Sequence, residues 1–339
     1  MSASSRKVGP LVTDLGRCLV TGAGGFIGSH LVEELCRRGA PVRALARYNG
    51  RGDTGWLADI DDACRDDVEI VLGDVRDPDQ MRALVAGCDT VFHLAALIGI
   101  PYSYVSPRQN LDTNAGGTLN LLEAARASGV RRFVHTSTSE VYGTAQYVPI
   151  DEEHPLVGQS PYAASKIAAD QVTVSYARSF DLPALIVRPF NTFGPRQSMR
   201  AVIPTIATQA LWSDAIRLGS LDTTRDFTFV RDTATGFIHA ALAEGVEGRT
   251  FNLGIGKEIA IGDLAELIRD VVGRDVPIEQ EDARMRPAAS EVDRLCSNPS
   301  NAHELLGWQP EHDLRTGLAL TIEWIRARGP RAGVEQFAV

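Results

Sequence analysis

The chain has 339 residues, of which 44% are hydrophobic, so it is long enough to bury a large core. Its net charge of −9, without a dense block of Lys and Arg, argues against nucleic acid or an acidic membrane surface as its main partner. The first sixteen residues lack the apolar core of a signal peptide, no apolar run approaches a membrane span, and the five cysteines have no metal-binding spacing. We therefore expect a cytoplasmic protein with reduced thiols, no membrane contact and no metal.

Regular structure is predicted to begin with a short apolar strand at 18–21, followed by glycines at GxxGxxG spacing and a helix from Ile27 to Arg38. Such glycines allow a tight turn, close approach of the backbone to a pyrophosphate, and packing of the helix against the strand. The pyrophosphate would lie at the helix N-terminus, where backbone N–H groups and the helix dipole favour an anion. The residues of this turn that we expect to contact a dinucleotide are Gly22, Gly25, Phe26, Ile27 and Gly28.

The end of the second strand, at 42–46, bears on the choice of cofactor. A carboxylate there binds the ribose 2′-hydroxyl of NAD, whereas an Arg favours the 2′-phosphate of NADP. This chain has Arg47 in that place and no acid. We therefore expect a nicotinamide dinucleotide, NADP or NAD, with NADP favoured; the alternative is a solvated surface role for Arg47.

Further strands at 68–72 and 90–93 alternate with helical segments, which extends the predicted parallel sheet. His93, at the end of one strand, is expected to be a packed core histidine rather than a catalyst. The segment from Ile98 to Arg108 is predicted to be a polar and aromatic loop that could border a sugar. The residues after these strands that we expect to border the dinucleotide are Asp74, Val75, Leu94, Ala95 and Ala96.

A cluster of four hydroxyls and one carboxylate follows the apolar strand predicted at 131–135. Ligands of open α/β sheets bind at the carboxyl ends of strands, so this cluster is a candidate catalytic floor. The alternative is that the hydroxyls cap the next turn and the carboxylate is solvated. The residues of the cluster are Thr136, Ser137, Thr138, Ser139 and Glu140.

Pro161 and the apolar pattern up to Phe180 predict a long helix. Tyr162 and Lys166 are four positions apart, so they share one helix face. The pKa of a tyrosine is ordinarily about 10, and a nearby ammonium group and a nicotinamide cation are both expected to lower it. Tyr162 is therefore a candidate base, the alternative being a buried tyrosine beside a snorkelling lysine.

From Asn191 onward the alternation of strands and helices breaks down, and we expect a substrate lobe there. Within it, an Arg in the segment 223–232 could clamp a diphosphate. The predicted fold is thus an α/β, Rossmann-type doubly wound parallel sheet with a smaller mixed α/β substrate lobe. The expected divisions are 17–190 plus 226–253 for the Rossmann domain, 191–225 plus 254–327 for the lobe, and loose tails at 1–16 and 328–339.

The motifs TGAGGFIG, HLAA, STSEVYG, YAASK, RPFNTFGPR, RDFTFVRD and ELLGW occur in this order. Over residues 17–327 the chain resembles an extended short-chain dehydrogenase/reductase of the nucleotide-sugar-modifying group. Within that group it is most similar to the LegB-type 4,6-dehydratases of nucleotide-linked N-acetylhexosamines, through TSTSEVYGTAQYVPIDE and IPYSY. It is less closely similar to GDP-mannose 4,6-dehydratases and UDP-glucuronate decarboxylases.

The resemblance implies a nucleotide-sugar 4,6-dehydratase that forms a 4-keto-6-deoxy sugar. Tyr162 would take the proton of the sugar 4-hydroxyl as hydride leaves carbon 4 for the nicotinamide, Lys166 would hold the nicotinamide ribose, and Thr138 would bind the 4-oxygen. Glu140 would remove the proton on carbon 5 while water leaves carbon 6, and the hydride would return to carbon 6. Ser139 stands where glucose-type dehydratases carry an acidic Asp, so the acid for water loss stays open and Glu140 could serve both steps.

The resemblance also implies the remaining contacts and the assembly. The expected cofactor contacts beyond the glycine turn include Thr136, Tyr162, Lys166 and Pro189, and the expected substrate contacts are Tyr102, Thr138, Asn191, Arg196, Arg225 and Arg286. A homodimer is expected through the helices at 115–127 and 160–180, with Leu121, Leu122, Val172 and Val174 as candidate contacts. A UDP-glucuronate decarboxylase and a 4-epimerase are the competing enzymes, and a dinucleotide-sensing regulator is the competing class.

Overall fold

A parallel sheet of seven strands forms the centre of the computed structural model, which describes residues 13–281 and 292–330. The strand order is β10-β6-β5-β4-β1-β2-β3, and it reverses between β1 and β4, so the predicted doubly wound sheet is confirmed. Its strands are β1 (Cys18–Thr21), β2 (Val42–Arg47), β3 (Val68–Gly73), β4 (Thr90–His93), β5 (Arg132–Thr136), β6 (Ala184–Pro189) and β10 (Thr250–Leu253).

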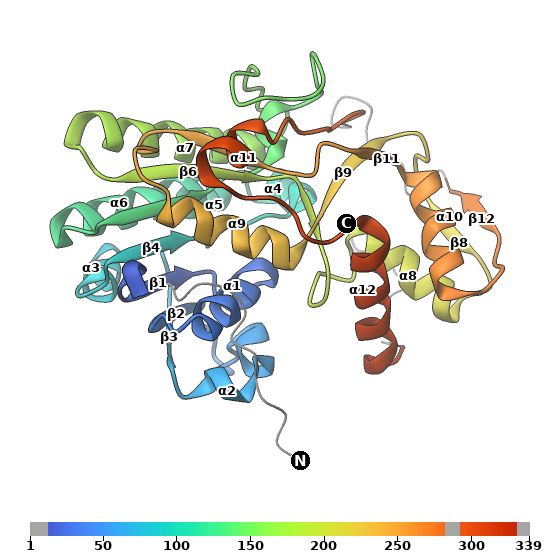
Figure 1. Ribbon diagram of the computed structural model, residues 1–339, viewed down its shortest axis with the longest axis horizontal. Helices are drawn as coiled ribbons and strands as arrows, with labels where there is room; N and C mark the ends of the chain where they lie inside the picture. Colours follow the sequence, from blue (N-terminus) through green and yellow to red (C-terminus); the bar gives the residue numbers. More distant parts are fainter. Residues whose placement is uncertain (1–12, 282–291, 331–339) are drawn as a thin grey trace.

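Helices cover both faces of this sheet, in the left part of Figure 1. Because side chains alternate along a strand, Val20 of β1 packs with Leu31 and Phe237 on one face, and Leu19 packs with Leu121 on the other. The helices of the first face are α1 (Phe26–Arg37), α2 (Asp62–Arg65), α9 (Val230–Leu242) and α11 (Ser300–Leu306), and those of the second are α3 (Pro78–Val85), α6 (Gly117–Ser128) and α7 (Pro161–Phe180).

A second core forms the lobe at the right of Figure 1, where Phe193 and Phe229 pack with Leu264 and Leu318. Its sheets have the orders β11-β9-β7 and β12-β8. Residues 226–229, which we expected in the Rossmann domain, lie in β9 and pair with this second sheet instead. The lobe contains β7 (Asn191–Phe193), β8 (Ile216–Leu218), β9 (Thr224–Phe229), β11 (Glu258–Ala260), β12 (Ile278–Gln280), α8 (Val202–Trp212), α10 (Ile261–Val272) and α12 (Leu314–Arg328).

Two other predictions about local structure were wrong. The segment expected to be a loop forms the short helices α4 (Ile100–Val105) and α5 (Pro107–Leu111), each with a proline in its first turn, where the fixed φ of proline suits a helix. Leu15, which we expected in a loose N-terminal tail, is instead packed against the sheet. Its side chain is buried, and its carbonyl accepts a 2.7 Å hydrogen bond from Thr90 Oγ1. The remaining short turns are η1 (Thr13–Leu15), η2 (Gly55–Asp59), a π-helical turn (Asp112–Gly116) and η4 (Ser139–Tyr142).

The last helix of the lobe contacts the loop that follows β2. The Arg328 guanidinium lies 5.0 Å from the ring centroid of Trp56 and 4.6 Å from that of Trp324, and its Nη2 is 2.8 Å from Asp59 Oδ2. The backbone N–H of Trp56 in turn donates to the Gly24 carbonyl at 3.0 Å. The contact of Arg328 with Trp56, together with the hydrogen bond from Trp56 to Gly24, therefore connects α12 to the glycine turn. Arg328 belongs to α12 and not to a tail, whereas residues 331–339 lie outside the described part.

The five cysteines are free thiols, four of them buried and Cys36 half-buried. Within residues 13–281 and 292–330, no helix has both the length and the apolar character that crossing a membrane requires.

Candidate active site

The glycine turn between β1 and α1 is closely packed against the end of β4. Gly22 has φ +68°, and a Cβ at this position would lie 2.7 Å from the backbone nitrogen of Ala95 and 2.9 Å from the carbonyl carbon of Leu94. A Cβ at Gly28 would lie 2.2 Å from the Gly22 carbonyl oxygen. Only glycine fits at these two positions, so the turn brings bare backbone to the carboxyl ends of β1 and β4.

The residues at this turn fit a dinucleotide. Gly25 is the N-cap of α1, and the first turn of that helix, which contains Phe26 and Ile27, has no acidic side chain to oppose an anion. A Cβ at Gly25 would lie 3.1 Å from the Gly22 carbonyl oxygen, so the absence of side chains here leaves a shallow cradle. Backbone N–H groups at a helix N-terminus behind such a cradle suit a pyrophosphate.

The adjacent strand ends carry the groups expected at the adenosine half. Arg47 is exposed at the end of β2, in register with Gly73 of β3. Asp74 follows directly and forms an ion pair with Arg76 at 2.5 Å. Its hydrogen bonds with Arg76 hold the Asp74 pKa below its usual value, to which the charge of Arg47 also contributes. Val75 is buried and packs against Gly117, so it can present only its backbone to a ligand.

The strand β5 ends at Thr136 and opens onto the turn η4. The Thr138 hydroxyl caps this turn by accepting a hydrogen bond of 3.3 Å from the Glu140 N–H. Ser139 is buried, whereas Thr138 and Glu140 are half-buried. One of the hydroxyls, that of Thr138, thus acts as a cap, as the alternative held, yet the same turn keeps the Glu140 carboxylate at the carboxyl end of the sheet.

Helix α7 brings Tyr162 and Lys166 to this strand end. Ser160 caps the helix by accepting from the Ala163 N–H at 3.1 Å, which fixes where the helix begins. Tyr162 is buried, and the side chain of Thr138 acts to lower the pKa of its phenol. Lys166 is also buried, and its Nζ donates to the Thr136 carbonyl at 2.5 Å. The structure therefore brings together the Thr138, Tyr162 and Lys166 side chains that the sequence placed on separate elements.

The electrostatics of Tyr162 differ from the sequence prediction. Burial raises the pKa of its phenol well above the ordinary value; the hydrogen bond with Thr138 opposes this, while the charges of Glu140 and Asp170 add to it. We expected the Lys166 ammonium group to lower the pKa of Tyr162. In the described residues Lys166 does not do so, because it donates to Thr136 and not to the phenol. Burial lowers the pKa of Lys166 to about 8.

Two residues behind the floor show what the sequence reasoning recognised and what it missed. His93 Nδ1 lies 2.8 Å from Thr21 Oγ1 and its Nε2 lies 2.9 Å from Thr118 Oγ1, and burial holds its pKa well below the ordinary value. The prediction of a packed core histidine is confirmed. Asn114 was not among the predicted site residues. Its Nδ2 donates to Ser165 Oγ at 2.9 Å, and it lies in a π-helical turn, a feature that only the three-dimensional structure shows.

The side chains expected to bind substrate fall into two groups. Asn191 on β7 is half-buried, and within the described residues no hydrogen-bond donor reaches its buried Oδ1. Arg225 on β9 is buried, and its Nη1 donates to the Thr224 carbonyl at 2.8 Å. Pro189, an expected cofactor contact, is buried at the end of β6, two residues before Asn191.

The remaining expected substrate contacts have the following surroundings. Arg196 Nη2 donates to Glu33 Oε1 of α1 at 2.8 Å and to the Asp59 carbonyl at 3.0 Å, so this guanidinium joins the lobe to the Rossmann domain, and its contact with substrate stays a prediction. Tyr102 is 46% exposed on α4, and its hydroxyl donates to Gln109 Oε1 at 2.6 Å. Arg286 lies outside the described residues.

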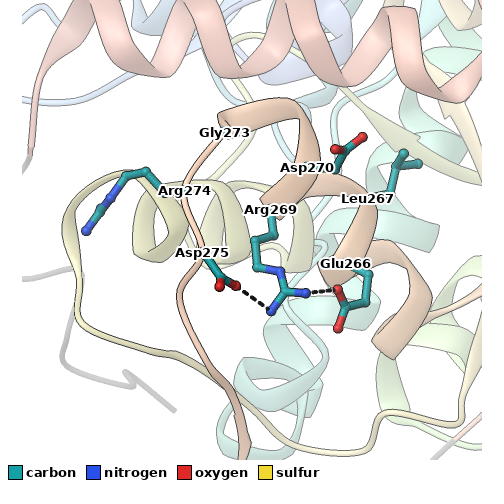
Figure 2. A pocket seen from close by; sticks show the side chains of 7 residues that line it. All are labelled: Glu266, Leu267, Arg269, Asp270, Gly273, Arg274 and Asp275. Atoms are coloured by element: carbon teal, nitrogen blue, oxygen red, sulfur yellow. Dashed lines mark hydrogen bonds and ion pairs between the residues drawn. The ribbon is translucent and has the colours of Figure 1, made fainter.

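Two hollows open on the surface of the described residues. One, of about 360 Å³, lies where the start of α1 meets the lobe, and its lining includes Phe26, Trp56, Ile98, Arg196, Met199 and Trp324. The other, of about 590 Å³, lies at the end of α10 (Figure 2). There, Arg269 pairs with Glu266 and with Asp275, and Arg274 donates to the Ala210 carbonyl at 2.9 Å. Because its cations are already engaged, the second hollow is not a candidate anion site.

Comparison with known proteins identifies this arrangement. The family model described as GDP-mannose 4,6 dehydratase matches residues 19–321. The chain belongs to this family. It is 36% identical to the UDP-glucose 4-epimerase of Mycolicibacterium smegmatis over 91% of this chain and 98% of that protein. It is 34% identical to the dTDP-glucose 4,6-dehydratase of Streptomyces antibioticus over 91% and 92% of the two chains.

A solved structure gives the same result for this GDP-mannose 4,6-dehydratase family member. DesIV, a dTDP-glucose 4,6-dehydratase from Streptomyces venezuelae with NAD and TYD bound, has a TM-score of 0.82 and 31% identity, over 92% of this chain and 97% of that chain. The protein is therefore an enzyme that modifies nucleotide-linked sugars. Epimerases and dehydratases both occur among its relatives, so family membership leaves the particular reaction open.

The packing of the glycine turn predicts the effect of one methyl group. Gly22→Ala is expected to weaken binding of NAD and NADP about 10-fold or more, because the new Cβ collides with the Leu94–Ala95 backbone that borders the cradle. The control is Gly129→Ala, since Gly129 has φ +64° and a Cβ there meets no described atom within 4 Å. Calorimetric titration of both variants measures the difference. Equal affinities for the two variants would show that backbone strain and not the collision matters.

Proposed function

We propose that this enzyme is a nucleotide-sugar 4,6-dehydratase that converts an NDP-N-acetylhexosamine, such as NDP-GlcNAc, to a 4-keto-6-deoxy sugar. The observation that carries the proposal is the half-buried Glu140 carboxylate, on the turn capped by Thr138 and close enough to Tyr162 for its charge to raise the pKa of that phenol. A hydride-transfer site alone needs no second acid–base group. A carboxylate at this place supplies one for the elimination of water.

The residues of the chain divide the work as follows. A bound nicotinamide dinucleotide supplies a reversible hydride acceptor. Tyr162 takes the proton of the sugar 4-hydroxyl, and the hydroxyl of Thr138, at the start of the turn that carries Glu140, holds the 4-oxygen. Lys166 donates to the Thr136 carbonyl beneath the floor and, as an ammonium group on the same helix face as Tyr162, holds the nicotinamide ribose. The proton on carbon 5 becomes acidic once carbon 4 is a ketone, and Glu140 then removes it.

A 4-epimerase is the second candidate, because the relative from Mycolicibacterium smegmatis carries that description at 36% identity. An epimerase needs Tyr162 and the redox step but has no use for a base near carbon 5. Incubation with a panel of UDP-, GDP-, CDP- and dTDP-linked sugars, read by product mass, separates the reactions. Loss of water supports the dehydratase, an unchanged mass supports the epimerase, and loss of carbon dioxide from a uronate supports a decarboxylase.

Glu140→Gln is expected to separate oxidation from elimination. Glutamine keeps the shape and hydrogen bonding but not the basicity, so release of dehydrated product should fall about 10²–10⁴-fold while the reduced dinucleotide and the 4-keto sugar still form. Tyr162→Phe should block both steps, because it removes the group that takes the first proton. Cofactor absorbance in a single turnover and product mass measure the two effects.

The control for this comparison is Glu153→Gln, which removes an exposed carboxylate from the loop beyond the site. It should dehydrate at the unaltered rate. If Glu140→Gln also dehydrates at nearly that rate, Glu140 is structural and the epimerase assignment moves ahead.

We also propose that Arg47 favours NADP over NAD. The support is its position: an exposed guanidinium ends β2, and the nearest strand-end acid, Asp74, is engaged by Arg76. The structure of DesIV contains NAD, so the relatives support the proposal of a nicotinamide dinucleotide. The proposed preference for NADP over NAD is supported by Arg47 alone.

Arg47→Asp is expected to weaken NADP about 10–100-fold more than NAD, because charge-assisted hydrogen bonds to the 2′-phosphate become repulsion. Arg51→Asp makes the same charge change at an exposed position in the same loop and serves as the control. Affinities for both dinucleotides are measured by calorimetry. Equal losses for NADP and NAD in Arg47→Asp would remove the argument.

We further propose that the enzyme is a cytoplasmic homodimer that pairs through α6 and α7. The prediction that Leu121 and Leu122 contact the partner subunit was wrong, because both side chains are buried in the core of their own subunit. The exposed apolar side chains on these helices are instead Leu119, 41% exposed, and Phe180, 47% exposed. The five free cysteines favour a reducing compartment.

Leu119→Arg is expected to convert the dimer to a monomer, because a charge would have to be desolvated at the centre of the paired helices. Leu305→Arg on α11 is the matched control, since Leu305 is 40% exposed on the opposite face of the sheet. Light scattering at micromolar concentration reports the mass. A monomer in the unaltered protein would contradict the proposal outright.

A further inference from the structure

A buried carboxylate lies beneath the catalytic floor, and the proposed reaction does not use it. Asp170 is on α7, one helical turn after Lys166, and is 1% exposed. A carboxylate loses most of its hydration when it is buried this completely, so it is retained only where charged or hydrogen-bonding partners surround it.

The partners of Asp170 come from the two strands that support the site. Its Oδ2 accepts from Ser137 Oγ at 2.8 Å and from the Arg188 guanidinium at 2.9 Å and 3.2 Å. Its Oδ1 lies 3.3 Å from His135 Nε2. Arg188 continues the network to the Tyr142 hydroxyl at 2.9 Å. Asp170 thus joins α7 to β5, to β6 and to the turn that carries Glu140.

The charges in this network are unequal. Burial acts to raise the Asp170 pKa, but the neighbouring His135 and the charges of Arg188 and Lys166 outweigh it and hold that pKa below its usual value. Burial lowers the pKa of His135 to about 4, so the imidazole is neutral near pH 7. One carboxylate therefore faces two buried cations, Arg188 and Lys166.

We propose that Asp170 is a positioning residue for the reaction, which keeps the Lys166 ammonium group charged and fixes the end of β5 on which it rests. The inference deepens the proposed function and rests on it for the role of Lys166. Two contacts carry it: Asp170 holds the Ser137 hydroxyl, and the preceding residue, Thr136, accepts the Lys166 Nζ at 2.5 Å. A single carboxylate thus holds the residue next to the acceptor of that short contact, and its charge acts on the lysine that donates.

The position of Asp170 also sets the charge of the lysine. Burial lowers the pKa of Lys166, and the charge of Asp170 partly opposes this by raising it. With both effects present, the Lys166 pKa is about 8. Without that charge, the ammonium group would lose its proton at lower pH. The other titratable or charged groups around this pair are His93 on β4, His135 on β5, Arg188 on β6, Glu140 and Tyr142 on η4, and Tyr162 on α7.

The test is Asp170→Asn in the full-length chain, which keeps the side-chain size and an acceptor for Ser137 but removes the charge. The sequence contains three lysines, Lys7, Lys166 and Lys257, so NMR of protein labelled with ¹³C at lysine Cε follows Lys166 directly, with Lys166→Arg for assignment. The titration midpoint of Lys166 should be about 8 in the unaltered protein and about 1 pH unit lower in Asp170→Asn. An unchanged midpoint would overturn the proposal.

The matched control is Ser137→Ala, which removes the contact of Asp170 with the strand end but no charge. It should lower stability yet leave the Lys166 midpoint where it is; a shift of equal size in both variants would mean a merely structural role. Should Asp170→Asn fail to fold because Arg188 loses its partner, the double variant Asp170→Asn/Arg188→Gln removes both charges and should show the same lowered midpoint.

Activity provides a second, separate readout. In a single turnover with a nucleotide sugar, the alkaline limb of the rate of dinucleotide reduction should move to lower pH in Asp170→Asn, together with the NMR midpoint. If no nucleotide sugar reacts, the proposed function fails while the titration still decides the charge coupling. If the midpoint moves and the rate profile does not, Lys166 is not the group that Asp170 serves in catalysis, and the proposal is overturned.

Discussion

The docking of α7 against the end of β5 is the interaction on which the candidate site depends. Lys166 contacts the last carbonyl of the strand and Asp170 contacts the next hydroxyl, so two successive turns of one helix hold two successive residues of the strand end. The Lys166 and Asp170 side chains are both buried, where an unpaired charge is far more costly than in water. The register of helix and strand is therefore strongly specified, and Tyr162 reaches Thr138 because of it.

The two cores of the protein are joined by charged groups from elements far apart in the sequence. Arg196 of the lobe reaches Glu33 of α1, and Arg328 of the last helix lies against both Trp56 and Trp324. The Arg196 contact is made to α1 and the Arg328 contact is made to η2. Trp56 of η2 also donates its backbone N–H to the glycine turn. The lobe is consequently tied to the part of the fold that would hold the dinucleotide, and not only to the sheet.

The relatives show that one scaffold serves several reactions on nucleotide sugars. In the proposed mechanism, hydride transfer uses α7 and the glycine turn. The proposed choice of the dehydratase reaction rests on side chains at the end of β5, Ser139 and Glu140. Because Ser139 is buried and Glu140 is half-buried, the carboxylate is the better placed of the two for acid–base chemistry.

Features that depend on neighbours along the chain were predictable from the sequence. The spacing of Gly22, Gly25 and Gly28 indicated the turn, and the four-residue spacing of Tyr162 and Lys166 indicated one helix face, because backbone geometry and helical period are local properties. The apolar strands and their order of alternation with helices likewise predicted the doubly wound sheet. His93 was recognised as a core residue from its place at the end of a buried strand.

Other features depended on which distant segments meet, and only the tertiary structure decided them. Sequence motif alone placed Arg196 at the substrate, whereas the fold brings Glu33 to it from 163 positions away. The pairing of β9 with β7 and β11, the partners of Asp170 and the raised pKa of Tyr162 have the same origin. Pairing partners and burial are properties of the whole packed chain, and local periodicity carries no information about them.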